Sequence, residues 1–109
     1  MKYSEVLYQL YDVIMDRQKN PKEGSYTNYL LEQGLDKVLK KIGEEAAETI
    51  IAAKNTDKNE VVSELSDLLY HISVLLAQKE LTWNTVFEEL ARRELKEGNL
   101  KNFHTKGEI

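Results

Sequence analysis

Two apolar stretches joined by a short polar turn set the architecture of this chain: GLDKVLKKIGEEAAETIIAAK (residues 34–54), NTD (55–57) and KNEVVSELSDLLYHISVLLAQK (58–79). In both stretches apolar residues recur three and four positions apart, which predicts two helices that fold back as an antiparallel hairpin. The apolar positions of 58–79 are wider than one stripe, so this helix is expected at the centre of a bundle or in a dimer interface. Asp57 and Glu60 have the spacing of a capping box for its start.

The same periodicity predicts two further helices. One covers about residues 4–18, where Ser4 can cap it, and the other covers about 83–96. Residues 20–24 break the pattern, and a polar and aromatic loop with a short turn is expected at 25–31. We therefore predict an all-α fold, an antiparallel bundle of about four to five helices. We expect a single domain over the whole chain, with a loosely ordered tail from about residue 97.

Composition excludes several classes of protein and site. The 109 residues include no cysteine, which excludes a disulfide framework, a zinc-thiolate site and a cysteine nucleophile, and which fits a reducing compartment. The formal net charge is -4 and no basic stripe is present, so nucleic acid is not expected as the main partner. No apolar run reaches the roughly 20 residues of a membrane span, and the start resembles an amphipathic helix rather than a signal peptide. These features predict a cytoplasmic protein that does not bind membranes.

Four acidic residues lie at mirrored distances from the hairpin turn. If the chain folds back about Thr56, Glu45 comes level with Asp67, and Glu48 comes level with Glu64. A helix turns about 100° per residue, and on this count all four side chains point to the same side of the helix pair. Carboxylates held at one height repel one another unless cations lie between them. The spacing therefore predicts a site for a hard divalent ion such as Mg²⁺.

The neighbours of these acids leave two interpretations open. Glu48, Glu64 and Asp67 have no Lys or Arg three or four residues away, as expected if an external cation neutralises them. The alternative is a solvated acidic face, because a chain with 19 acidic residues contains such pairs by chance. One turn further from the loop, Lys41 and His71 come level by the same count. Lys41 could contact a phosphate oxygen, while His71 could contact a substrate or Asp67, or be structural.

The acidic residues also carry a resemblance to a known family. The run KIGEEAAE (41–48), followed by ELSD (64–67), resembles the EExxE and ExxD signature of the all-α, MazG-type nucleotide pyrophosphatases. The segments SYT (25–27), KK (40–41) and DLLYH (67–71) narrow the resemblance to the phosphoribosyl-ATP pyrophosphatase family. The resemblance covers roughly residues 5–94, and the end of the chain departs from the short basic ending typical of the family.

This resemblance implies a reaction, a cofactor and partners. The reaction is the Mg²⁺-dependent hydrolysis of the α–β phosphoanhydride of phosphoribosyl-ATP, the second step of histidine biosynthesis, with phosphoribosyl-AMP and pyrophosphate as products. A homodimer is expected, with phosphoribosyl-AMP cyclohydrolase as a possible functional partner. The cyclohydrolase's metal-binding cysteines are absent here, so the chain resembles the stand-alone pyrophosphatase.

The resemblance also implies roles for particular residues. The expected metal ligands are Glu45, Glu48, Glu64 and Asp67. The expected catalytic residues are Glu44, Glu45 and Lys41, with Glu44 as general base or as a support for the ligands. The expected substrate contacts are Ser25, Tyr26 and Thr27, closing over the substrate from their loop, together with Lys37, Lys41 and His71. Arg92 or Arg93 could supply a further cation.

Two other functions compete with this interpretation. A MazG-type house-cleaning enzyme would share the metal site but act on ordinary or damaged nucleoside triphosphates, and a panel of substrates distinguishes it. A non-enzymatic helical module would bind a partner through its dimer surface. The module predicts no affinity for magnesium and tolerance of charge-neutralising substitutions at all four acids.

Overall fold

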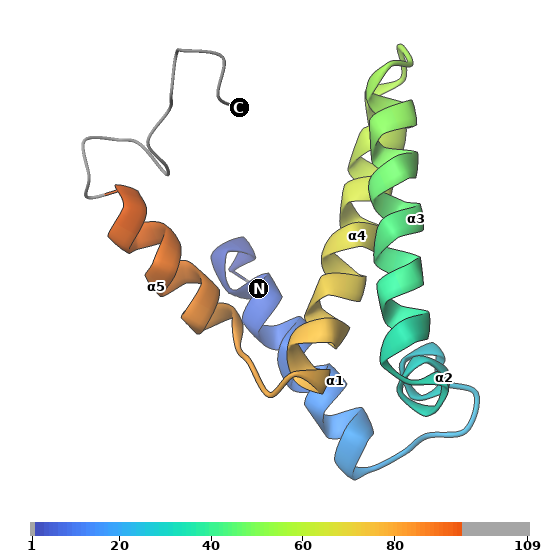
Figure 1. Ribbon diagram of the computed structural model, residues 1–109, viewed down its shortest axis with the longest axis vertical. Helices are drawn as coiled ribbons and strands as arrows, with labels where there is room; N and C mark the ends of the chain where they lie inside the picture. The colour runs from blue at the N-terminus through green and yellow to red at the C-terminus, as the bar shows by residue number, and fades with distance from the viewer. Residues whose placement is uncertain (1, 95–109) are drawn as a thin grey trace.

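A computed structural model describes residues 2–94, and every regular element within that range is helical (Figure 1). The elements are a short 3₁₀ helix η1 (Tyr3–Glu5) and the helices α1 (Val6–Lys19), α2 (Tyr26–Gln33), α3 (Leu35–Ala53), α4 (Lys58–Gln78) and α5 (Trp83–Glu94). The predicted all-α fold is confirmed, and both hairpin helices begin and end within one residue of their predicted bounds. The predicted loose tail lies outside the described residues.

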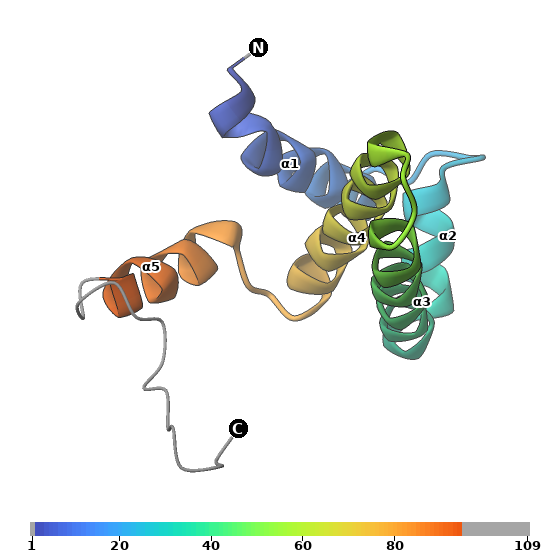
Figure 2. The same ribbon diagram turned by 90° about the horizontal axis from the view of Figure 1, so that it is seen from above.

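The α3–α4 hairpin forms the long axis of the molecule, and α1 and α2 lie against one half of it (Figure 1). α1 crosses α4, and α2 lies against the start of α3 (Figure 2). The core lies where these four helices meet, and its fully buried members are Ile14, Leu30, Val38 and Val74. α5 points away from the hairpin and contacts α1, where the Tyr8 and Phe87 rings meet edge to face.

The half of the hairpin nearest its turn is bare. Ile50, Ile51 and Val62 keep 68%, 63% and 62% of their surface exposed. The expectation that α4 is buried on several sides therefore holds only for its C-terminal half, which contains all of its buried residues. No helix within residues 2–94 has the length and apolar character to cross a lipid bilayer.

Of the two predicted helix caps, the structure corrects one and confirms part of the other. Ser4 does not cap the first helix, because it lies within the 3₁₀ turn that leads directly into α1. Asp57 does cap α4, and its carboxylate accepts a hydrogen bond from the backbone N–H of Asn59 at 2.9 Å. The capping box is incomplete, however, because the Glu60 carboxylate accepts from the Asn55 side-chain amide at 2.8 Å instead.

The segment predicted as a loop at 25–31 is largely the helix α2. Ser25 lies at its N-cap in an extended conformation, and its hydroxyl oxygen accepts from the backbone N–H of Asn28 at 3.2 Å. α2 ends at Gly34, whose φ of 90° is a conformation that glycine adopts without steric cost. Because α3 begins at the next residue, Gly34 is the only residue between α2 and α3.

Candidate functional site

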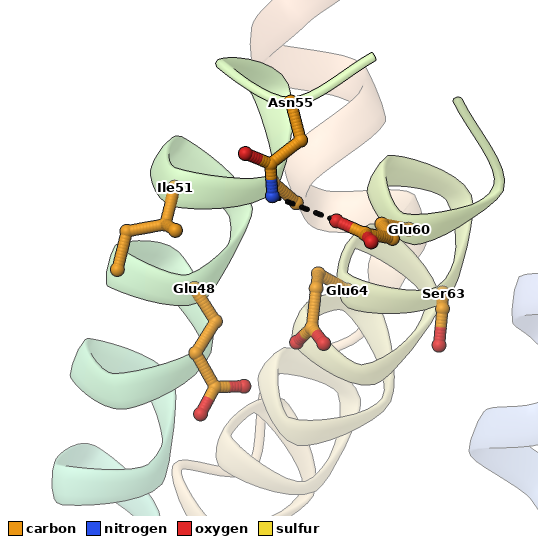
Figure 3. Close-up of a pocket in the computed structure, with 7 residues that line it drawn as sticks. Glu48, Ile51, Asn55, Glu60, Ser63 and Glu64 are labelled. Carbon is orange, nitrogen blue, oxygen red and sulfur yellow. Dashed lines mark hydrogen bonds between the residues drawn. The ribbon is translucent and has the colours of Figure 1, made fainter. Parts of the chain in front are cut away.

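Three of the four predicted metal ligands converge between α3 and α4. Glu45, Glu48 and Glu64 each offer a carboxylate oxygen, and these oxygens lie within 4.8 Å of one another. Glu48 and Glu64 point toward each other across the gap between the helices (Figure 3). The register predicted from the sequence therefore brings these acids together as expected.

Asp67 is not part of that group. Its side chain is exposed on α4, one turn beyond Glu64, and the Asp side chain is one methylene shorter than that of Glu. The carbonyl oxygen of Asp67 accepts a hydrogen bond from His71. Its role as a metal ligand stays a prediction.

The converging carboxylates are only partly hydrogen-bonded within the part of the chain that the structure describes. Within residues 2–94, Glu45 Oε2 and Glu64 Oε2 are buried and have no hydrogen-bond partner. A buried carboxylate oxygen without a partner is costly, so either a shared proton or a cation should occupy this space. Its neighbours raise the pKa of Glu64 to about 7, through a hydrogen bond with Glu48, partial burial and the proximity of Glu45. The donor set consists of carboxylate oxygens, which suits a hard divalent cation.

A cavity of about 290 Å³ opens beside the cluster, toward the hairpin turn (Figure 3). Glu48 and Glu64 form the side of the cavity nearest the site. The residues that complete its lining are Ile51, Ala52, Asn55, Glu60 and Ser63. Sequence reasoning did not identify these residues, because nothing in their spacing distinguishes them from an ordinary helix surface.

Lys41 lies at the edge of the acidic cluster. Its ammonium nitrogen is 3.4 Å from Glu44 Oε1 and 3.8 Å from Glu45 Oε1. Partial burial alone would lower the pKa of Lys41, but the Tyr26 phenol and the Glu44 and Glu45 carboxylates together raise it above the usual lysine value. Lys41 is therefore a cation held next to the site.

The residues on α2 and α4 that were predicted to contact the substrate form hydrogen bonds within the protein. The Tyr26 hydroxyl lies 3.0 Å from His71 Nε2, and Thr27 is buried with its hydroxyl hydrogen-bonded to that of Tyr70. Residues 25–27 were expected in a loop that closes over a substrate. The loop is wrong, because Ser25 caps α2 and Tyr26 and Thr27 lie in its first turn, whereas the substrate contact stays a prediction. Sequence reasoning gave Tyr70 no structural role, because its partner is 43 residues away in the chain.

The remaining cationic side chains that were predicted to contact the substrate or the site interact with other side chains of the protein. The Lys37 ammonium lies over the Tyr29 ring, 5.9 Å from its centroid. Arg92 and Arg93 both donate to Glu89 on α5, through Nε at 3.0 Å and 2.8 Å. These hydrogen bonds, Arg92 first, lower the pKa of Glu89 to about 2. α5 points away from the hairpin, so any contact between these arginines and an acidic cluster stays a prediction.

Comparison with known proteins settles the family. The family described as phosphoribosyl-ATP pyrophosphohydrolase matches residues 7–94. The chain belongs to this family. The phosphoribosyl-ATP pyrophosphatase of Clostridium novyi is 50% identical over 97 residues, which cover 89% of this chain and 88% of the relative. That of Listeria welshimeri is 52% identical over 104 residues, which cover 95% and 97%.

Other relatives of the phosphoribosyl-ATP pyrophosphohydrolase family are longer proteins. The histidine biosynthesis bifunctional protein HisIE of Thermoanaerobacter pseudethanolicus is 58% identical over 86 residues, which cover 79% of this chain. The chain spans only 40% of the length of that relative, and 43% of the corresponding protein of Caldanaerobacter subterraneus. The family resemblance deduced from the acidic signature is therefore confirmed.

Proposed function

We propose that this protein hydrolyses phosphoribosyl-ATP to phosphoribosyl-AMP and pyrophosphate, by cleaving the bond between the α and β phosphates. The observation that carries this proposal is the convergence of Glu45, Glu48 and Glu64 in a chain of this family. Within residues 2–94, two of their oxygens are buried without a hydrogen-bond partner, and a bound cation would satisfy both. The names of the relatives support a place in histidine biosynthesis.

We infer that the cation is Mg²⁺, held by Glu45, Glu48 and Glu64, with Asp67 as a fourth ligand. Carboxylate oxygens are the ligands that magnesium prefers in phosphate-processing sites. When bound there, it would neutralise charge on the phosphates and make a bound water more acidic. The buried oxygens support this assignment, because a cation would satisfy Glu45 Oε2 and Glu64 Oε2, which have no hydrogen-bond partner among the described residues.

The side chains around the cluster would bind the substrate and move a proton. Lys41 would attract phosphate oxygens, since its ammonium already lies at the edge of the site. Lys37, above the Tyr29 ring, is our second candidate for a phosphate contact. Glu44 is exposed and next to Lys41, so we propose that it acts as the general base that accepts a proton from the attacking water. Glu45 is proposed to contribute to catalysis by holding the cation as one of its ligands.

The residues on α2 would form one edge of the substrate site. Ser25 and Thr27 use their hydroxyls within the protein, so we propose that they act by holding α2 in place. Tyr26 and His71 form a hydrogen-bonded pair at the same edge. A substrate contact by either of them remains part of the proposal.

Pyrophosphate release from phosphoribosyl-ATP, with and without magnesium, tests the proposed function. Glu48→Gln should abolish turnover without unfolding the protein, because it removes one ligand charge from an exposed side chain. Glu88→Gln is the matched control, since Glu88 is exposed on α5 and should leave turnover intact. Near-normal turnover in Glu48→Gln would refute the ligand assignment. Release from ordinary nucleoside triphosphates in place of phosphoribosyl-ATP would favour a house-cleaning enzyme.

We further propose that the protein acts as a homodimer in the cytoplasm. Ile50, Ile51 and Val62 expose apolar surface on the half of the hairpin that α1 and α2 leave bare, and a second copy could cover it. The bifunctional relatives support phosphoribosyl-AMP cyclohydrolase as the partner that consumes the product. The absence of cysteine fits the proposed location.

A further inference from the structure

A second cleft, of about 530 Å³, lies along α2, and we call it the α2 cleft. It is lined by residues 22–26, which lead from the α1–α2 loop into α2, and by Asn28, Tyr29 and Glu32 of α2 itself. Within residues 2–94, it shares no lining residue with the cavity beside the acidic cluster. Its volume is in the range of about 300–1,000 Å³ that small-molecule sites occupy.

Asn28 holds the wall of the α2 cleft in place. Its side-chain oxygen accepts a hydrogen bond from the Lys22 backbone N–H at 2.9 Å, and its amide donates to the Arg17 carbonyl oxygen of α1 at 2.8 Å. The Ser25 backbone N–H donates to the Lys22 carbonyl oxygen at 3.1 Å. The loop is therefore tied to both helices, so a ligand does not have to order it on binding.

Two tyrosine rings give the α2 cleft an aromatic surface. Tyr26 and Tyr29 keep 45% and 43% of their surface exposed, and their rings stack with centroids 6.0 Å apart. Tyr26 also stacks on Tyr70, and its hydroxyl oxygen lies 3.0 Å from His71 Nε2. The two exposed rings are thus fixed in position, and they offer a flat ligand a surface on which to stack.

The charges around these rings favour a cation. Among the described residues that line the α2 cleft, Glu23 and Glu32 bring carboxylates and Lys22 brings an ammonium. The Lys37 ammonium reaches over the Tyr29 ring from α3, 5.9 Å from its centroid, which is within the range of a cation–π contact. Exposed aromatic faces beside carboxylates are suited to an organic cation, so a flat organic cation matches both the rings and the charges.

The α2 cleft is connected to the face of α4 that carries the acidic cluster. Tyr26 reaches from the cleft to His71, and His71 follows Glu64 by seven residues, which is close to two full helical turns. Glu64 and His71 therefore lie on one face of α4, about 10 Å apart along its axis. This separation is comparable to the length of a nucleotide, so a base in the cleft leaves its phosphates near the acids.

We propose that the α2 cleft binds the purine base of the substrate as a planar cation, stacked on Tyr26 and Tyr29 with Glu32 beside its charge. A substituent on a ring nitrogen of adenine gives the base a positive charge at neutral pH, whereas the base of ATP is neutral. A phosphoribosyl group carried there would let the cleft distinguish phosphoribosyl-ATP from ATP by charge. The identity of the substrate rests on the proposed function, whereas the preference of the cleft for a cationic purine does not.

Two nucleosides test the cleft without any turnover. 1-Methyladenosine carries a positive charge at pH 7, and 1-methylinosine has the same substituent on a neutral base. In protein with ¹³C-labelled tyrosine, 1-methyladenosine should shift the ring signals of Tyr26 and Tyr29, assigned with Tyr→Phe variants, and leave Tyr8 near α5 unchanged. It should bind about tenfold more tightly than 1-methylinosine. Equal affinities, or shifts that spare both tyrosines, would overturn the proposal.

Variants of the lining separate the charge from the stacking. Glu32→Gln should weaken 1-methyladenosine about threefold, as expected for an exposed ion pair, and leave 1-methylinosine unaffected. Tyr29→Leu should weaken both nucleosides about tenfold, because both lose a stacking surface. Glu88→Gln on exposed α5 is the matched control and should change neither affinity. An affinity for 1-methyladenosine that Glu32→Gln leaves unchanged would also overturn the proposal.

Turnover distinguishes a failure of this proposal from a failure of the proposed function. Glu32→Gln should raise KM for phosphoribosyl-ATP about threefold with little change in kcat, because it alters binding away from the bond that breaks. If the unaltered protein released no pyrophosphate, the proposed function would fail, and the two nucleosides would still decide what the cleft binds. If it released pyrophosphate while Tyr26 and Tyr29 ignored 1-methyladenosine, the proposed function would stand and the assignment of the cleft would be refuted.

Discussion

Binding of a divalent cation to the acidic cluster should release a proton from Glu64. The pKa of this carboxyl is raised to about 7, chiefly by its hydrogen bond with Glu48, whereas a carboxylate that binds a cation must be ionised. With that pKa, about 0.9 of the molecules hold the proton at pH 6 and about 0.1 hold it at pH 8. The cation should therefore displace nearly one proton at pH 6 and almost none at pH 8.

Calorimetric titration with Mg²⁺ in two buffers of different ionisation enthalpy measures this proton release directly. The apparent affinity should be about tenfold weaker at pH 6 than at pH 8, since the proton competes with the cation for the same oxygens. Glu88→Gln, on exposed α5, should leave both quantities unchanged. Equal proton release at the two pH values, or release that persists in Glu64→Gln, would refute the reasoning.

The same carboxyl links the stability of the cation-free protein to pH. The folded-state pKa of Glu64 lies above its ordinary value of 4.5, so the fold binds this proton more tightly than the unfolded chain does. Its contribution to stability is therefore fully present below pH 4.5 and is lost as the pH rises through about 7. Urea unfolding at pH 6 and pH 8 should show this decline, and saturating Mg²⁺ should reduce it.

Three further predictions concern the helices that support the site. Trp83→Phe removes the indole N–H that donates to buried Ser73 at 2.9 Å, and should cost about 1–3 kcal/mol in urea unfolding; an unchanged midpoint would contradict it. Ile51→Glu should shift light-scattering mass from dimer to monomer, whereas Ile51→Val should not. Gly34→Ala, at a φ of 90°, should destabilise the fold by about 1 kcal/mol, measured as a lower melting temperature.

The hairpin and its acids could be predicted because they depend on local rules. The 3.6-residue period of α3 and α4 fixes which side chains share a face, and a short turn fixes the heights of the two helices. Glu45, Glu48 and Glu64 consequently meet as predicted. The Asp67 carboxylate lies outside the group that the three glutamates form, and its role as a ligand stays a prediction.

The features that the sequence did not predict correctly depend on contacts between residues far apart in the chain. α2 has only eight residues, among them Tyr, Thr and Asn, which have modest helix propensity, so its sequence also suits a loop. What holds α2 is its packing and the bonds of Tyr26 and Thr27 to α4, which no local pattern reveals. Glu60 could have completed a capping box, but Asn55 offered a competing donor from the turn.

The single residue between α2 and α3 has a consequence for changes in chain length. One residue inserted at Gly34 would rotate α2 by about 100° relative to α3, which would carry Tyr26 away from His71. The exposed segment at 20–24, in contrast, has several residues over which a change in length can be spread, and its hydrogen bond to α2 runs from the Lys22 backbone N–H to Asn28 Oδ1 at 2.9 Å. Labels, tags and deletions introduced into this protein should therefore be tolerated by the fold at 20–24 and rejected at the α2–α3 joint.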